Sequence, residues 1–243
     1  MACRTALRAS VLVALLCTTA TWADPVEWLA LSQPATPAAQ ADALSQESKP
    51  KPTAAPTPKP EGPWAGDPSR FFQGALLGFL GHEMGHVVAN YAVGSDPYLM
   101  RVDFGFIPFF TIQPDRLLTH REHYLTASAG FNAENLINEW LLVKHPNLAD
   151  EDEPLLKGMA TFNFCLTVGY ALDAFTGFGP DERDTKGMAD SLGWSEEAVG
   201  VLILGPALLD GYRFRHPDCK WARDTSRVLK LLMLGLALSA DSD

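Results

Sequence analysis

Three residues in one short stretch have the types and the spacing of a zinc site. His82, Glu83 and His86 form the pattern HExxH, here HEMGH. Side chains four residues apart lie on the same face of a helix, so two imidazoles can hold one metal ion. A catalytic zinc takes a third protein ligand and a water. The pattern therefore predicts a Zn²⁺-dependent hydrolase in which Glu83 acts as catalytic base and activates a zinc-bound water.

The motif lies within a helix that the flanking residues predict. Asp67 suits the N-cap and Pro68 the first helical position. The run from Phe71 to Val93 is otherwise largely apolar. Burying imidazoles and a carboxylate there is costly unless they are paired or bind a metal. This context favours a metal site over two surface histidines.

A third ligand must come from later in the chain. Three carboxylates lie in apolar segments and are candidates: Glu134, Asp173 and Asp210. Each of them could instead cap a helix or pair with an arginine. The residue types alone do not rank them.

The elements around the motif are mostly helical. Apolar patterns predict further helices over residues 123–143, 155–175, 196–212 and 227–239, and β-branched and aromatic residues predict one or two strands over 98–112. The expected fold class is mainly α: an apolar helical bundle with a small β element near residues 98–112. The long apolar runs and their small residues predict a bundle embedded in a membrane. A soluble bundle with a very apolar core is the alternative, because the basic loop after residue 212 conflicts with the positive-inside tendency.

The N-terminal residues have the composition of an export signal followed by a linker. Arg4 and Arg8 precede an apolar stretch, and residues 21–23 form a small-x-small cleavage site. We expect a signal peptide over 1–23, with an uncleaved anchor as the alternative, a Pro/Ala-rich disordered linker over 24–66 and a folded domain over 67–240. The expected location is the membrane or cell envelope.

Charge and cysteine content narrow the function classes. The formal net charge is -10, which argues against a nucleic-acid partner because the phosphate backbone would repel the chain. Cys165 and Cys219 would remain after signal cleavage. They could pair in an oxidising compartment, or Cys165 could be a buried free thiol in its apolar run.

Three segments in order resemble the site-2 protease family of intramembrane zinc metalloproteases. HEMGH looks like the HExGH of that family, ASAGFNAEN (127–135) is similar to its small-Ala-Gly-Pro-x-x-Asn segment, and GPALLDG (205–211) resembles its LDG motif. The similarity covers about residues 71–212. It implies that His82, His86 and Asp210 are the metal ligands and that Glu83 is the catalytic base.

Together the residues and the resemblance predict a zinc-dependent endopeptidase that acts within or next to a membrane. Its expected substrate is a peptide or a membrane protein. The segment 98–112 could bind an extended substrate at a strand edge, or it could simply pack against the first helix. Two other functions stay open: a soluble or monotopic gluzincin-like peptidase with Glu134 as third ligand, and a non-catalytic envelope scaffold.

Overall fold

The computed structural model describes residues 67–104 and 107–240. The predicted signal peptide and linker lie outside the described residues. The elements follow in the order α3 (Pro68–Val93), β1 (Tyr98–Phe104), β2 (Ile107–Gln113), α4 (His120–Ala127), α5 (Ala129–Lys144), α6 (Pro154–Thr176), α7 (Asp184–Leu192), α8 (Glu196–Arg215), α9 (Lys220–Gly235) and the 3-10 turn η3 (Leu236–Leu238).

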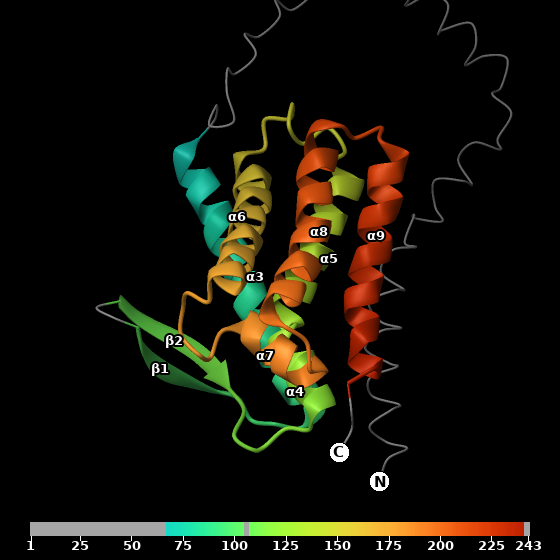
Figure 1. The fold of residues 1–243 in the computed structure, drawn as a ribbon. Helices are drawn as coiled ribbons and strands as arrows, with labels where there is room; N and C mark the ends of the chain where they lie inside the picture. The colour runs from blue at the N-terminus through green and yellow to red at the C-terminus, as the bar shows by residue number, and fades with distance from the viewer. Residues whose placement is uncertain (1–66, 105–106, 241–243) are drawn as a thin grey trace, which may run out of the picture. The chain divides into compact units, whose positions relative to one another are not determined.

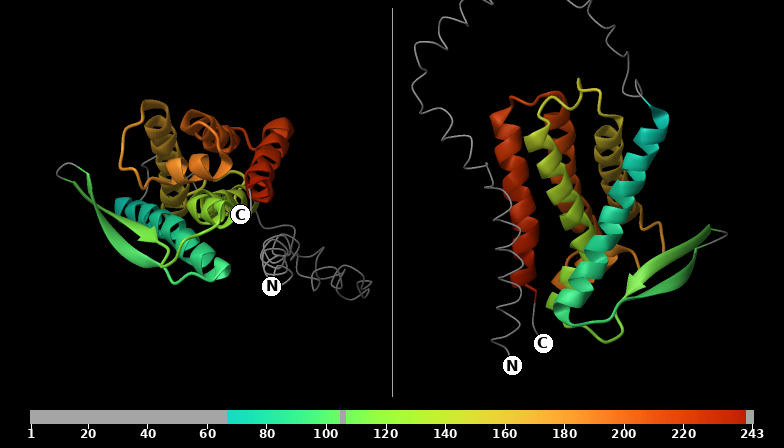
Figure 2. Two further views of the ribbon diagram at one scale, coloured as in Figure 1. Left: turned by 60° about the horizontal axis from the view of Figure 1, so that its bottom comes forward. Right: turned by 180° about the vertical axis from the view of Figure 1, so that it is seen from behind.

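The long helices α3, α5, α6, α8 and α9 form a bundle (Figure 1). The short helices α4 and α7 and the β1–β2 hairpin lie together at one end of it, as the views in Figures 1 and 2 agree. β1 and β2 pair antiparallel with Tyr98 opposite Gln113 and Phe104 opposite Ile107. The prediction of a mainly helical domain with a small β element near 98–112 is therefore confirmed.

Helix α3 begins as predicted and buries an unusual stripe. The Asp67 side chain accepts a hydrogen bond from the Ser69 amide, and Gly94 ends the helix in the left-handed conformation with φ 80°. The buried residues recur every fourth position and are small or polar: Gly74, Gly78, His82, His86 and Asn90. One face of α3 thus presents both histidines of the motif to the interior of the bundle.

Glycines allow α3 to lie directly against α6. A Cβ on Gly74 would lie 1.8 Å from the carbonyl oxygen of Leu155, and one on Gly158 would lie 2.0 Å from that of Phe71. Only glycine permits such an approach of two backbones, as in small-residue helix contacts. This contact fixes the helix that carries the motif against α6.

Three features of the helices differ from the expectation. The segment predicted as one helix over 123–143 is broken at Ser128 into α4 and α5. Helix α7 was not predicted at all, and α9 begins at Lys220, earlier than expected. Both α4 and α7 contribute to the core, where Tyr124 and Met188 are fully buried with Phe131, Ile203 and Met233.

Few of the described helices are long and apolar enough to cross a membrane. In the part of the chain that the structure describes, α6 is the one helix that is long and apolar enough. Counting α7 and α8 as one span, bent by 115°, would bring the number to two. The described helices thus offer fewer candidate spans than the long apolar runs in the sequence suggest.

Candidate metal centre

Three ligand atoms from two helices converge at one point. His82 Nε2 and His86 Nε2, both from α3, lie 3.2 Å apart. Oδ2 of Asp184, the first residue of α7, lies 3.2 Å from each of them. Four-coordinate zinc with nitrogen ligands at 2.0–2.1 Å requires neighbouring ligand atoms about 3.3 Å apart. The triangle therefore has the dimensions of three corners of a zinc tetrahedron, and this His-His-Asp group could hold a metal ion.

The other nitrogen of each imidazole is held by an acceptor. His82 Nδ1 lies 2.6 Å from Oε1 of Glu134, and His86 Nδ1 lies 2.8 Å from the carbonyl oxygen of Thr126. A carbonyl and a carboxylate can only accept, so each Nδ1 must carry the hydrogen. In the neutral imidazoles the lone pair is then on Nε2, the atom that faces Asp184. The tautomers needed for metal binding are thus set by Glu134 and Thr126.

The electrostatics of the site suit a cation. Both imidazoles are buried, and burial alone would lower their pKa values. The hydrogen bonds and charges of Asp184 and Glu134 outweigh burial at His82 and raise its pKa to about 10, and Asp184 likewise raises the pKa of His86. Burial would raise the pKa of Asp184, but His86 and His82 hold it well below its usual range. A proton and a metal ion therefore compete for the same atoms.

Gly130 leaves the room that an ion at this point requires. A Cβ on this residue would lie 2.4 Å from His82 Nε2 and 2.6 Å from His86 Nε2. Gly130 is in the first turn of α5, directly after the break at Ser128. The small-residue segment that resembles the family motif thus places a glycine where any side chain would occupy the metal position.

Aromatic rings enclose His82. Phe131 meets it edge-on with ring centroids 5.5 Å apart, and Tyr170 of α6 stacks on it at 5.8 Å and 17°. Phe131 and Tyr170 also contact each other at 5.1 Å. These rings exclude water from one side of the site, which strengthens interactions among the charged groups within it.

Glu83 lies next to the ligand group and is partly buried. Burial raises the pKa of its carboxyl above the ordinary value, while the charges of His82 and His86 act in the opposite direction. A base whose pKa lies nearer neutrality can both take up and release a proton at physiological pH. The direction of this shift suits a catalytic base, and that role of Glu83 stays a prediction.

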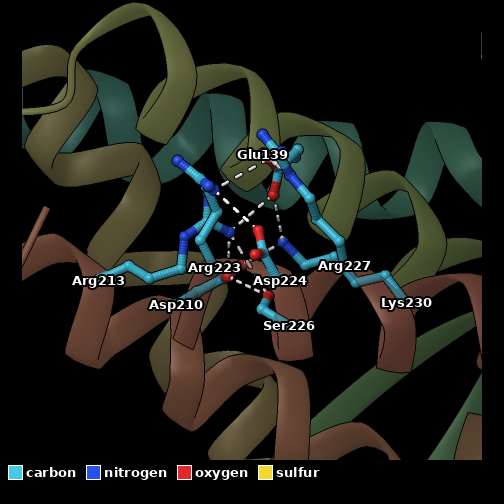
Figure 3. Close-up of polar contacts among 8 residues, drawn as sticks. All are labelled: Glu139, Asp210, Arg213, Arg223, Asp224, Ser226, Arg227 and Lys230. Atoms are coloured by element: carbon cyan, nitrogen blue, oxygen red, sulfur yellow. Dashed lines mark hydrogen bonds and ion pairs between the residues drawn. The ribbon is translucent and has the colours of Figure 1, made fainter. Parts of the chain in front are cut away.

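Asp210, the expected third ligand, lies in a different cluster (Figure 3). Its Oδ1 accepts hydrogen bonds from Arg213 Nη1 at 3.0 Å and from Ser226 Oγ at 2.6 Å, and its Oδ2 lies 2.6 Å from Lys230 Nζ. Arg213 and Lys230 thus already balance the charge of Asp210. Among the described residues, the carboxylate that lies beside both histidines is that of Asp184. The assignment of Asp210 to the metal is corrected accordingly.

The two other candidate carboxylates also have different surroundings. Glu134 contacts the nitrogen of His82 that faces away from the ligand triangle, and its second oxygen accepts from Thr167 Oγ1 at 2.6 Å. It therefore orients His82 and lies outside the His-His-Asp group that could hold a metal ion. Asp173 lies near Arg183 and Glu196, and it has no part in the His-His-Asp group.

The two cysteines of the domain are free thiols. Cys165 is exposed on α6, so the alternative that it is a buried thiol is wrong. Cys219 is partly exposed at the start of α9. Neither cysteine belongs to the candidate metal centre.

Sequence reasoning missed Asp184 because it looked for carboxylates in apolar runs. Asp184 follows the polar stretch PDER and begins a helix of 9 residues. The signal that could have found it is the spacing of Thr185, Met188 and Ala189, which are buried on one face of α7. That pattern places an acidic residue at the start of a helix that packs into the bundle.

Comparisons of the chain with models of protein families, with curated proteins and with solved structures gave no match. Conclusions about the chemistry of this site therefore depend on its geometry.

Proposed function

We propose that this protein is a zinc-dependent endopeptidase. The observation that carries the proposal is the triangle of His82 Nε2, His86 Nε2 and Asp184 Oδ2, with edges of 3.2 Å. Two buried imidazole nitrogens and a partly buried carboxylate oxygen at this separation repel one another unless a cation or a proton lies between them. Two imidazoles and one carboxylate in tetrahedral spacing, with one corner left over, are the donor set of a catalytic zinc site.

In the proposed hydrolysis each residue of the site would have a distinct role. His82, His86 and Asp184 would hold the zinc, which when bound polarises the scissile carbonyl and lowers the pKa of water. Glu83 takes a proton from the attacking water and delivers it to the amine that leaves. Glu134 and Thr126 keep both imidazoles in the orientation that the metal needs.

We also propose that the enzyme acts at a membrane on a peptide or membrane-protein substrate. The support is the inverted pattern of α3, whose buried stripe is small or polar. Between Phe72 and Tyr91 every exposed side chain except Gln73 is large and apolar: Phe72, Leu76, Leu77, Phe79, Leu80, Met84, Val88 and Tyr91. A helix on the surface of a water-soluble bundle has the opposite pattern. An apolar face of this extent fits lipid chains.

The membrane contact can be tested with spin labels after Cys165 and Cys219 are replaced by serine. Labels at Leu76 and Leu80 in protein reconstituted into phospholipid vesicles are expected to be more accessible to oxygen than to a polar nickel chelate. A label at Asp190, an exposed polar position on α7, serves as the control. A label at Leu76 with the same preference as the label at Asp190 would overturn the membrane assignment.

The catalytic assignment is tested with Glu83→Gln. We expect the variant to keep its zinc and to lose cleavage of fluorescein-labelled casein and of a quenched fluorescent peptide library. Glu197→Gln, an exposed residue at the start of α8, should cleave like the wild type. Equal cleavage by Glu83→Gln would overturn the mechanism. A zinc-loaded wild type without any cleavage would favour the scaffold function instead.

A further inference from the structure

The chain on both sides of Asp184 is tied to one carboxylate. Glu196, the first residue of α8, accepts from Arg183 Nε at 2.6 Å and from Arg183 Nη2 at 2.5 Å. It also accepts from Thr185 Oγ1 at 2.6 Å. The residue before Asp184 and the residue after it therefore share a single partner on another helix.

The contacts of Glu196 with Arg183 and Thr185 are largely shielded from solvent, which strengthens them. The side chains of Arg183 and Glu196 are 10% and 16% exposed, and Thr185 is fully buried. A two-pronged arginine–carboxylate pair with little solvent fixes both distance and orientation. Arg183 Nη1 also donates to the carbonyl oxygen of Pro180 at 2.9 Å, which ties the approach to α7 into the same group.

Glu196 is itself fixed in position by the capped and buried first turns of α8. The Ser195 side chain caps α8 by accepting from the Ala198 amide, and the next turns bury Val199 and Ile203 in the core. By contrast, α7 has 9 residues, a length at which a helix gains little stability from its own hydrogen bonds. The position of Asp184 must therefore come from tertiary contacts.

We propose that Glu196 is the positioning residue for the third metal ligand. By holding Arg183 and Thr185 together, it places Asp184 at the two histidines from a helix that is far away in sequence. This inference rests on the proposed metal site. It goes further, because it assigns the precision of that site to a residue that touches neither the metal position nor the motif. Metal sites need such support, since small displacements of a ligand are costly.

The expected effect is on metal affinity and geometry. Glu196→Gln keeps the size of the side chain but removes the charge that holds the guanidinium. We expect zinc affinity to fall by roughly 10–100-fold, the range typical when a residue that supports a ligand is altered. Glu197→Gln is the matched control, because it removes a carboxylate from the same first turn of α8 at an exposed position. Arg183→Lys is a second variant, which keeps the charge and loses the two-pronged contact.

The experiment measures zinc affinity of the full chain by competition with a chromophoric chelator, together with the visible absorption of the cobalt-substituted protein. Support requires that Glu196→Gln and Arg183→Lys bind zinc at least about ten-fold more weakly than wild type and Glu197→Gln. Their cobalt spectra should also lose the intensity of a tetrahedral site.

Two results would overturn the inference while leaving the metal site in place. One is wild-type zinc affinity in both variants. The other is a lower melting temperature of the metal-free variants with unchanged affinity and an unchanged cobalt spectrum, since that result assigns Glu196 a purely structural role. A wild-type chain that binds no zinc would overturn the proposed function itself, and this inference with it.

Discussion

His86 Nδ1 and the carbonyl oxygen of Thr126 lie 2.8 Å apart, at the point where one helix ends and the next begins. The last carbonyls of a helix have no amide partner further along the same helix. The break at Ser128 therefore supplies an acceptor for the imidazole and brings Gly130 against both histidines. The break between α4 and α5 therefore has two effects at the candidate metal centre.

Gly130 lies so close to both histidines that one added methyl group should change zinc binding. Gly130→Ala should abolish zinc binding, because its Cβ would lie 2.4 Å from His82 Nε2. The measurement is zinc content after purification in the presence of the metal. Gly169→Ala in α6 is the control, since a Cβ there meets nothing within 4 Å. Zinc in Gly130→Ala at the wild-type level would contradict the geometry of the site.

We expect substitution of Glu134 to weaken zinc binding only in part, because Glu134 contacts Nδ1 of His82 and not the Nε2 that faces Asp184. Glu134→Gln should weaken zinc binding by about 10–100-fold and not abolish it. Chelator competition measures this affinity. Glu139→Gln, also in α5, should leave the affinity unchanged while lowering stability. Complete loss of zinc in Glu134→Gln, even at saturating metal, would instead identify Glu134 as a ligand.

The ion cluster in Figure 3 predicts how stability depends on acid. Burial would raise the pKa of Glu139, but the hydrogen bond from Arg213 and the charge of Lys230 lower it to about 2. A lowered pKa means that the ionised form stabilises the fold. This contribution is complete above the unfolded-state pKa, near 4.5, and is lost as pH falls through the folded-state value.

Chemical denaturation at a series of pH values between about 6 and 2 tests this dependence. The free energy of unfolding of wild type should decrease across the range more steeply than that of Glu139→Gln. At neutral pH the variant should be less stable by roughly 1–3 kcal/mol, because the buried Arg213 keeps its charge and loses one of its two carboxylate partners. Parallel pH profiles for the two proteins would show that Glu139 is not coupled to these cations.

Local patterns in the sequence predicted the structural features that depend only on residues close together in the chain. Asp67 and Pro68 gave the start of α3, and the four-residue spacing of the histidines placed them on one face. The apolar periods likewise indicated most of the long helices and the β segment. These features follow from periods and caps that a single segment contains.

The third ligand could not be predicted in this way, because it depends on which helices meet. Asp210 matched a short motif, but Arg213 and Lys230 neutralise it in the folded chain. Asp184 belongs to a short helix whose position is set by contacts with Glu196 and the core. The break at Ser128 was missed for a related reason, since small residues are compatible with a continuous helix and with a kink.

In the proposed metal site Asp184, and not Asp210, completes the ligand set with His82 and His86. The most direct test is elemental analysis of zinc in purified wild type, Asp184→Asn and Asp210→Asn, two variants with the same change of side chain. We expect about one zinc ion per chain in wild type and in Asp210→Asn, and almost none in Asp184→Asn. Zinc that is retained in Asp184→Asn and lost from a folded Asp210→Asn would contradict the claim.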